Sequence, residues 1–198
     1  MNKGTIIGVD EVGRGPLAGP LAVGALRIAR KHQKLLKGVK DSKKLDAAAR
    51  ERWYKKLRAL EKEGSIVCKV AFVSERIIDR HGIPRALMRA VGSCLRRLAA
   101  GREAVVLLDG ALYAPPCYVR QRTIIRGDEK HLVIAAASII AKVRRDRRMK
   151  ALSKKYPLYL FESHKGYGTK AHYERLRRHG PSAIHRLSYL KKFAAARQ

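Results

Sequence analysis

A short apolar run followed by two acids and a glycine turn constrains this chain more than any other stretch. Residues 5–9 are β-branched, small or apolar, which predicts a buried strand. Asp10 and Glu11 follow directly, and Gly13-Arg14-Gly15-Pro16 predicts a tight turn. Neighbouring side chains on a continuing strand point to opposite faces. The glycines, however, predict that the strand ends here, so we expect both carboxylates to reach one cleft.

Two adjacent carboxylates at the end of a buried strand are costly unless they find a partner. Buried charges either shift their pKa or pair with another group, and a metal ion is one such partner. The alternative is a strand that ends in solvated acids. Asp10 and Glu11 alone do not decide between these two interpretations.

The net charge of the chain indicates a polyanionic partner. Lysine and arginine number 45 against 16 aspartates and glutamates, which gives a formal charge of +29. Solubility of a small domain needs only about 2–8 units. Nucleic acid is the first candidate because neutralising phosphates releases counterions. An anionic membrane surface is the second, and a merely solvated basic face is the remaining alternative.

The rest of the chain predicts strands with helices between them. After the first strand, strands are predicted over residues 20–28, 65–73, 104–108 and 119–126. Helices are predicted over residues 46–61 with Asp46 as N-cap, 74–81 with a break near Gly82, 84–100, 131–154, 170–179 and 183–193. This order favours an α/β domain with a mixed central sheet flanked by helices.

Cysteine usage and the chain start favour a reducing compartment. Cys68, Cys94 and Cys117 are widely spaced and lack zinc-ligand spacing. The first strand begins so early that we expect no signal peptide. Apolar runs stay well short of the roughly 18 residues of a spanning helix. We therefore expect a cytoplasmic protein with no membrane association.

Two further acids join the first pair at one predicted sheet edge. Asp109 follows the strand over residues 104–108, and Asp128 follows Gly127 before the long helix. In open α/β sheets, sites assemble at the carboxyl ends of strands. Carboxylate oxygens suit Mg²⁺ or Mn²⁺ rather than zinc. Two such ions about 3.5–4 Å apart stabilise the attacking water and the leaving oxygen of a phosphodiester.

With these residues in place, the chain closely resembles bacterial ribonuclease HII, the type 2 ribonuclease H. Matching blocks run in order along nearly the whole chain. They are residues 8–20 (GVDEVGRGPLAGP), 41–45 (DSKKL), 108–110 (LDG), 127–128 (GD), 134–143 (IAAASIIAKV), 145–146 (RD), 164–169 (HKGYGT), 180–182 (GPS) and 185–186 (HR).

The resemblance implies a ribonuclease H-like fold. Residues 1–155 would form the catalytic domain, and residues 156–198 a C-terminal loop and helical appendage packed on it. It also implies metal-dependent endonucleolytic cleavage of the RNA strand in RNA–DNA hybrids. A second implied activity is incision 5′ to a single ribonucleotide embedded in duplex DNA, which leaves 3′-hydroxyl and 5′-phosphate ends.

The resemblance assigns the four acids first. Asp10, Glu11, Asp109 and Asp128 match the family's metal-binding catalytic acids, with Mg²⁺ or Mn²⁺ as the cofactor. Asp146, one helical turn after Lys142, is expected to support this cluster, with pairing to a neighbouring arginine as the alternative.

A second group would recognise the ribonucleotide. Gly13, Arg14 and Gly15 match the family's ribonucleotide-sensing loop, and Tyr167 matches its partner tyrosine. The 2′-hydroxyl is what distinguishes RNA from DNA at one nucleotide, and glycines allow the backbone to approach it closely. An ordinary turn is the alternative, whereas a dinucleotide-binding GxGxxG is excluded because the next glycine, Gly19, comes one place too late.

Four further residues of the matched blocks are expected to contact phosphates: Ser42, Lys43, Ser138 and Lys142. For each lysine, a solvated cation is the equal alternative. His164, His172 and His185 lack ligand spacing and are expected to be structural or close to phosphate.

The chain departs from the family pattern at a few positions. Asp46 stands in place of a common serine, and Gly168 in place of a common proline. Ser182 and Tyr189 replace the usual threonine and phenylalanine, which leaves the C-terminal phosphate contacts open.

Two rival interpretations remain. One is a non-catalytic nucleic-acid binder with vestigial acids, which the presence of all four acids disfavours. The other is the sister type, ribonuclease HIII, which carries an extra N-terminal domain for which we expect no space before Thr5. The partners are expected to be RNA–DNA hybrids and ribonucleotide-containing duplex DNA, bound by a monomer. A sliding clamp is possible, but the tail over residues 191–198 shows no docking motif.

Overall fold

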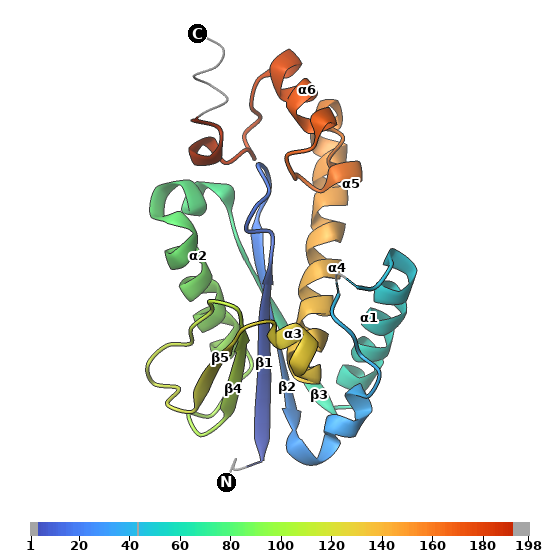
Figure 1. Ribbon diagram of the computed structural model, residues 1–198, viewed down its shortest axis with the longest axis vertical. Coiled ribbons are helices and arrows are strands. Elements are labelled where there is room, and N and C mark those ends of the chain that lie inside the picture. The colour runs from blue at the N-terminus through green and yellow to red at the C-terminus, as the bar shows by residue number, and fades with distance from the viewer. Residues whose placement is uncertain (1–3, 43, 192–198) are drawn as a thin grey trace.

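A five-stranded mixed sheet in the order β3-β2-β1-β4-β5 forms the centre of the protein (Figure 1). The computed structural model describes residues 4–42 and 44–191. In it, β1 (Thr5–Val12), β2 (Leu21–Ala29) and β3 (Ile66–Val73) pair antiparallel. The strands β4 (Val105–Asp109) and β5 (Gln121–Ile124) run parallel to β1. The predicted α/β class with a mixed sheet is confirmed.

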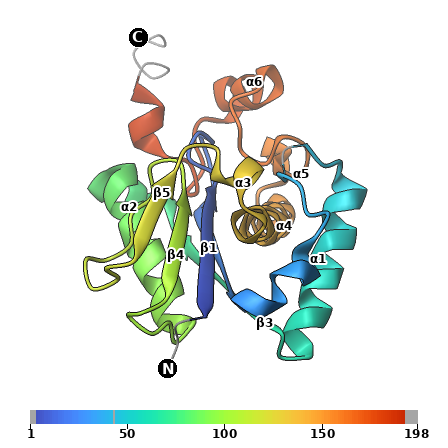
Figure 2. The same ribbon diagram turned by 60° about the horizontal axis from the view of Figure 1, so that its bottom comes forward.

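Helices cover both faces of this sheet (Figure 2). On one face, α2 (Glu75–Arg97) packs over a core that includes Val9, Val23 and Leu108. On the other face, α1 (Ala47–Lys62) and α4 (Leu132–Lys155) enclose a second core. The shorter elements are η1 (Arg30–Leu36), α3 (Gly127–Lys130), η2 (Pro157–Tyr159), α5 (Phe161–His164), α6 (Lys170–His179) and η3 (Leu187–Tyr189).

The long helix α4 lies directly on β1 and β2 because two glycines leave room for its backbone. A Cβ at Gly8 would lie 2.2 Å from the backbone carbonyl of Val133, and one at Gly24 would lie 2.5 Å from the carbonyl oxygen of Ala137. Any side chain at these positions would push the helix away. The close approach brings Ser138, the next residue of α4, to the carboxyl end of β1.

Strand β1 is longer than the sequence predicted. It continues to Val12 and pairs with β2 as far as Ala22, so Asp10 and Glu11 lie inside the strand. The prediction that the glycines end the strand at Val9 is therefore wrong. Pairing with the parallel neighbour does stop there, because the last β1–β4 pair is Val9 with Leu108. The acids sit where β1 loses that neighbour, which leaves space for them at the sheet edge.

The C-terminal segment packs over the far end of α4 (Figure 1). Its small core joins Leu17 and Met149 to Phe161, Leu176 and Ile184. The helix predicted over residues 183–193 is absent among the described residues, which show an extended stretch and the single turn η3. Residues 192–198 lie outside the described part of the chain.

The helix 183–193 fails because the segment pairs with residues 17–19 instead. The amide of Arg186 donates to Leu17, and the amide of Gly19 donates to Ile184, both at 2.8 Å. These bonds need extended backbone, and they hold the C-terminal segment against the glycine turn.

Other local predictions are confirmed. The Asp46 carboxylate accepts from the amide of Ala49 at 2.7 Å, as expected of an N-cap. Gly82 interrupts α2 with φ of 76°, where the sequence predicted a break. Within residues 4–42 and 44–191, no helix is long and apolar enough to cross a membrane.

Candidate active site

Three carboxylates converge at the carboxyl ends of β1 and β4. Asp10, Glu11 and Asp109 each present an oxygen, and these oxygens lie within 4.8 Å of one another. We call these three residues the acid cluster. Asp10 is buried, and the other two are partly buried. The parallel pairing of β1 with β4 produces this convergence, because it brings two strand ends to the same edge.

Burial and mutual repulsion make the acid cluster unfavourable without a cation. Burial, followed by the nearby Glu11 charge, raises the pKa of Asp10 well above its ordinary value. Burial also raises the pKa of Glu11, although the Arg14 guanidinium opposes this effect. Oε2 of Glu11 is a buried oxygen with no hydrogen-bond partner among the described residues. A buried oxygen without a donor, next to carboxyl groups whose pKa values are raised, is the environment that a bound cation would stabilise.

Fixed donors orient each member of the cluster. Asp10 accepts from the Glu11 amide at 2.7 Å and also from the hydroxyl of Ser138. Ser138 in turn lies 2.7 Å from the hydroxyl of Ser42. Because an ionised carboxylate only accepts, Ser138 donates to Asp10 and Ser42 donates to Ser138. The amide of Gly127 donates to Asp109 at 2.6 Å.

Asp128, the fourth predicted acid, lies outside the 4.8 Å group. It is buried at the start of α3, directly after the residue whose amide holds Asp109. Together with Asp41 and Lys44 it lines a pocket of about 270 Å³. The structure thus brings three predicted acids together and places the fourth on the adjoining loop.

The turn over residues 13–15, which we call the glycine loop, follows the acid cluster directly. Gly13 has φ of 91°, and a Cβ there would lie 2.3 Å from Nε of the Arg145 side chain. Arg14 is exposed and forms an ion pair with Glu11 at 3.2 Å. Gly15 is exposed. Gly13 is buried, so the loop presents only Arg14 and Gly15 to solvent beside the acid cluster.

Two buried arginines hold the glycine loop from behind. The Arg186 guanidinium donates to the carbonyl of Gly13 at 2.7 Å and to that of Arg14 at 2.8 Å. The Arg145 guanidinium donates to Pro20 at 2.9 Å and to Lys165 at 3.1 Å. Both side chains are 0% exposed. Burial lowers the pKa of Arg145 to about 10, so the side chain remains charged at neutral pH.

Tyr167 lies on the loop between α5 and α6 and is 39% exposed. Its ring centroid lies 5.7 Å from the guanidinium carbon of Arg145, the same side chain that packs against Gly13. Gly13 and Tyr167, which lie far apart in the sequence, thus pack against the same arginine. The structure brings Tyr167 and the glycine loop into one neighbourhood.

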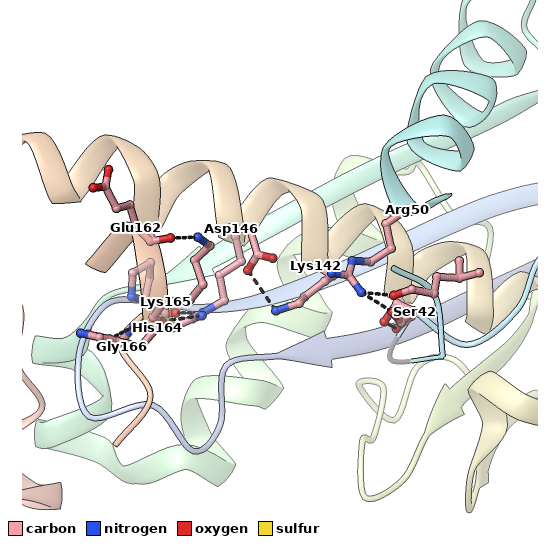
Figure 3. A network of polar contacts seen from close by, with 12 residues as sticks. Ser42, Arg50, Lys142, Asp146, Glu162, His164, Lys165 and Gly166 are labelled. Atoms are coloured by element: carbon pink, nitrogen blue, oxygen red, sulfur yellow. Dashed lines mark hydrogen bonds and ion pairs between the residues drawn. The ribbon is translucent and has the colours of Figure 1, made fainter. Parts of the chain in front are cut away.

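Two of the predicted phosphate contacts, Ser138 and Lys142, belong to α4, and Ser42 lies on the chain before α1 (Figure 3 shows Lys142 and Ser42). Lys142 donates to Asp146 at 3.1 Å, so Asp146 pairs with a lysine one helical turn away. Ser42 and Ser138 are buried and bond to each other rather than lie open to a ligand. The Arg50 side chain donates to the carbonyl of Ser42 at 2.8 Å. Lys43 lies outside the described residues.

Sequence reasoning missed the supporting residues. Arg145, His185 and Arg186 stood within matched blocks, whereas His172 did not, and the histidines were expected only to be structural or close to phosphate. The only available signal was that His185 directly follows the apolar Ile184 in a segment rich in turn formers.

Comparison with known proteins gives a consistent result. The family model described as Ribonuclease HII matches residues 7–192. A ribonuclease HII of Caldicellulosiruptor bescii is 47% identical over 186 residues, which cover 94% of this chain and 86% of the relative. A ribonuclease HII of Bacillus anthracis is 44% identical over 184 residues, which cover 93% and 68% of the two chains.

Solved structures show the same fold. The PCNA:RNase HII complex of Archaeoglobus fulgidus contains a chain with a TM-score of 0.75 and 28% identity, covering 92% of this chain and 94% of that one. Ribonuclease H2 of Pyrococcus horikoshii has a TM-score of 0.75 and 29% identity, and the match covers 97% of this chain and 98% of that one. Bst-RNase HIII in complex with Mn²⁺ also gives 0.75, but at 24% identity it bears on the fold alone.

Proposed function

The chain belongs to the ribonuclease HII family and is an endoribonuclease that acts on RNA–DNA hybrids, and from this premise we propose a finer activity. It incises duplex DNA 5′ to a single embedded ribonucleotide and leaves 3′-hydroxyl and 5′-phosphate ends. The observation that carries this proposal is the convergence of three carboxylates within 4.8 Å in a protein of net charge +29.

The acid cluster, together with Asp128, would hold Mg²⁺ or Mn²⁺. The family is metal-dependent, and the residues present fit hard cations. All the donors are oxygens, and Glu11 offers a buried oxygen that has no partner among the described residues. The raised pKa values of Asp10 and Glu11 also fit, because a bound cation would offset both the burial and the mutual repulsion that raise them. Divalent cations supply Lewis acidity to the attacking water and to the departing 3′-oxygen.

The chain's own residues prepare this site. Ser42 and Ser138 fix the orientation of Asp10, while the Gly127 amide fixes Asp109. Arg14 neutralises part of the Glu11 charge from the solvent side. These fixed donors hold the carboxylates ready, so little reorganisation accompanies cation binding.

Ribonucleotide recognition would fall to Gly13, Arg14, Gly15 and Tyr167. Gly15 of the glycine loop is exposed beside the acid cluster, as backbone contact with a 2′-hydroxyl requires. The half-exposed Tyr167 ring would lie against the sugar of the neighbouring deoxynucleotide, with its hydroxyl as a donor. The Arg145 side chain, which touches both parts, supports a common role for them.

Duplex binding would depend on the cationic surface, with Lys43 and Lys142 as phosphate contacts, whereas the buried Ser42 and Ser138 would act by orienting Asp10. Of these, Lys142 is the best placed, because it is partly exposed on the α4 face beside the cluster. Asp146 would act by holding Lys142 rather than by touching the cation. We propose a monomer with a catalytic domain over residues 1–155 and an appendage over residues 156–198. A sliding clamp, present with the Archaeoglobus fulgidus relative, is a partner to test.

Cleavage of matched duplexes tests the proposal. A labelled duplex with one ribonucleotide is compared with an RNA–DNA hybrid and an all-DNA duplex, each with Mg²⁺, Mn²⁺ or chelator. The proposal expects a single cut 5′ to the ribonucleotide, 3′-hydroxyl and 5′-phosphate ends, and no cleavage with chelator or of all-DNA duplex. Cleavage confined to hybrids would refute the single-ribonucleotide activity.

A further inference from the structure

The segment that carries His185 and Arg186 is anchored on two sides of the molecule. Its bridge to residue 18 joins it to the chain that follows the glycine loop. Asp79 of α2 accepts from the amides of Leu187 and Ser188 at 2.8 and 3.0 Å. The segment therefore holds a fixed position relative to the sheet. The buried side chains of His185 and Arg186 extend from this anchored backbone.

His185 begins a hydrogen-bonded chain that ends on Tyr167. The amide of Ser182 donates to Nδ1 of His185 at 2.8 Å, so the proton of this neutral ring lies on Nε2. Nε2 of His185 lies 3.0 Å from Nε2 of His172, which must accept. Nδ1–H of His172 then donates to the Tyr167 carbonyl at 2.9 Å.

The environment keeps these rings neutral, as the chain of donors requires. Burial lowers the pKa of both His172 and His185 to about 4. The charged or titratable neighbours that act on them are the two rings themselves and His164, which stacks on His172 at 4.3 Å between centroids. Tyr159 and Phe161 contribute the aromatic walls.

Arg186, the next residue, holds the other half of the recognition site. Its guanidinium binds the carbonyls of Gly13 and Arg14, as described above, and that of Gly19 at 2.8 Å. Its face lies over the Tyr189 ring, whose hydroxyl also donates to the Arg14 carbonyl at 2.9 Å. The carbonyls of the glycine loop are thus drawn inward.

Tyr167 needs such an anchor because its approach is strained. Lys165 has φ of 52° and Gly166 has φ of 85°, so two consecutive residues adopt left-handed backbone. A non-glycine residue in this region persists only when its surroundings determine it. A Cβ at Gly166 would lie 2.4 Å from the Ala18 carbonyl oxygen, so the loop that carries Tyr167 is packed closely against the chain that follows the glycine loop.

We propose that His172, His185 and Arg186 are positioning residues that fix the spacing between Tyr167 and the glycine loop, and thereby set the discrimination between a ribonucleotide and a deoxyribonucleotide. This inference rests on the proposed role of Tyr167. His185 reaches Tyr167 through His172, and the next residue, Arg186, bonds directly to the glycine loop. Neither side chain needs to touch the nucleic acid.

A pair of substitutions at position 172 separates this role from general packing. Gln places a polar group near the position of Nε2, so His172→Gln retains the contact with His185 and loses that with Tyr167. Asn places a donor near Nδ1, so His172→Asn retains the bond to Tyr167. The measurements are kcat/KM on a duplex with one ribonucleotide and Kd for the same duplex in all-DNA form.

We expect His172→Gln to lower kcat/KM about tenfold, the equivalent of one hydrogen bond, and to leave the all-DNA Kd within twofold. His172→Asn keeps the bond to Tyr167 but loses the contact with His185, so it should recover only part of the loss. His179→Gln, an exposed histidine at the end of the same helix, is the control and should behave as wild type. Equal losses for Gln and Asn, or a parallel loss of all-DNA affinity, would overturn the proposal.

A double-mutant cycle with Tyr167→Ala tests the route. In the Tyr167→Ala background, His172→Gln should lower kcat/KM by less than twofold, because the backbone carbonyl remains but the ring that the bond positions is gone. A persisting tenfold loss would overturn the positioning role alone. If Tyr167→Ala itself leaves kcat/KM unchanged, the assignment of Tyr167 fails, and this inference fails with it.

Milder variants keep the test open if His172→Gln does not fold. Ser182→Ala removes the hydroxyl 2.8 Å from Nδ1 of His185 and leaves the buried rings in place. Arg186→Lys keeps the charge but cannot bind three carbonyls at once. Each should lower kcat/KM severalfold at constant all-DNA Kd, and unchanged kcat/KM in both folded variants would overturn the proposal.

Discussion

Two buried polar regions flank the glycine loop, and they differ in how their polar groups are paired. The acid cluster gathers three carboxylates within 4.8 Å, and among the described residues Oε2 of Glu11 has no hydrogen-bond partner. On the other side lies the C-terminal scaffold, by which we mean Arg145, His172, His185 and Arg186. Its ring and guanidinium nitrogens bond to carbonyls, to a neighbouring ring or to the amide of Ser182. One region concentrates negative charge, and the other pairs its polar groups within the chain.

The difference indicates what each region is for. A buried group without a partner costs free energy, and such groups persist where a ligand completes them. A satisfied polar network instead rigidifies the backbone to which it bonds. The acid cluster therefore fits a cation site, whereas the C-terminal scaffold is a frame for the glycine loop and Tyr167.

The largest effect is expected from Asp10→Asn. The variant removes one charge from the cation site, so cleavage should fall on the order of 10³-fold or more, which corresponds to several kcal/mol of lost stabilisation. Hybrid binding should survive, because the cationic surface is intact. Gel-based cleavage and binding assays measure both quantities.

Glu103→Gln, an exposed acid, is the matched control and should cleave as wild type. Cleavage by Asp10→Asn within tenfold of wild type would contradict the role of the acid cluster and would remove the contrast between the two regions.

Arg145→Ala should have the next largest effect, on stability. The substitution leaves the buried carbonyls of Pro20 and Lys165 without their donor, and we expect the free energy of unfolding to fall by about 3 kcal/mol. Urea denaturation measures the change. Arg148→Ala, an exposed arginine of the same helix, should cost almost nothing. Similar values for the two variants would show that the scaffold is not satisfied as described.

The histidines predict a smaller, pH-dependent effect. Their folded pKa of about 4 lies below the unfolded value of about 6.5, so the unfolded chain binds more protons between these limits. Stability should therefore fall as pH drops from 6.5 toward 4. His172→Gln lacks one of these groups, so its free energy of unfolding should fall less between pH 7 and pH 5, by on the order of 1 kcal/mol.

Thermal melts of wild type and His172→Gln across this range measure the difference. A constant difference in melting temperature at all pH values would mean that His172 is not held neutral by the fold.

Lys142→Ala should give the smallest change. If Lys142 contacts a phosphate, hybrid affinity should fall severalfold and the slope of log K against log salt should decrease by about one. Lys62→Ala, an exposed lysine in the last turn of α1, is the control. An unchanged slope would leave Lys142 as a partner of Asp146 only.

Local features of the fold were predictable from the sequence, and long-range ones were not. The N-cap at Asp46 and the break at Gly82 follow from residue chemistry that acts within a few positions. The length of β1 does not, because its pairing with β2 carries it to Val12 despite the glycine that follows. The C-terminal helix was predicted wrongly for the same reason, since pairing with residues 17–19 overrides local propensity.

The candidate site divides in the same way. The acids could be recognised in the sequence because Asp10, Glu11 and Asp109 follow apolar runs and Asp128 precedes the long helix. Parallel pairing of β1 with β4 then brings the first three together. The bond between Ser42 and Ser138, and the chain from His185 to Tyr167, join residues whose spacing carries no signal. Matched blocks pointed to these residues, but only coordinates show what they contact.

Binding of Mn²⁺ to metal-free protein tests the central claim most directly, because it asks whether the acid cluster is a cation site. Thermal melts of wild type and Asp10→Asn are recorded across an Mn²⁺ titration after treatment with chelator. We predict a saturable rise in melting temperature for wild type and little or none for Asp10→Asn. An equal rise in both proteins, or no rise in either, would contradict the account.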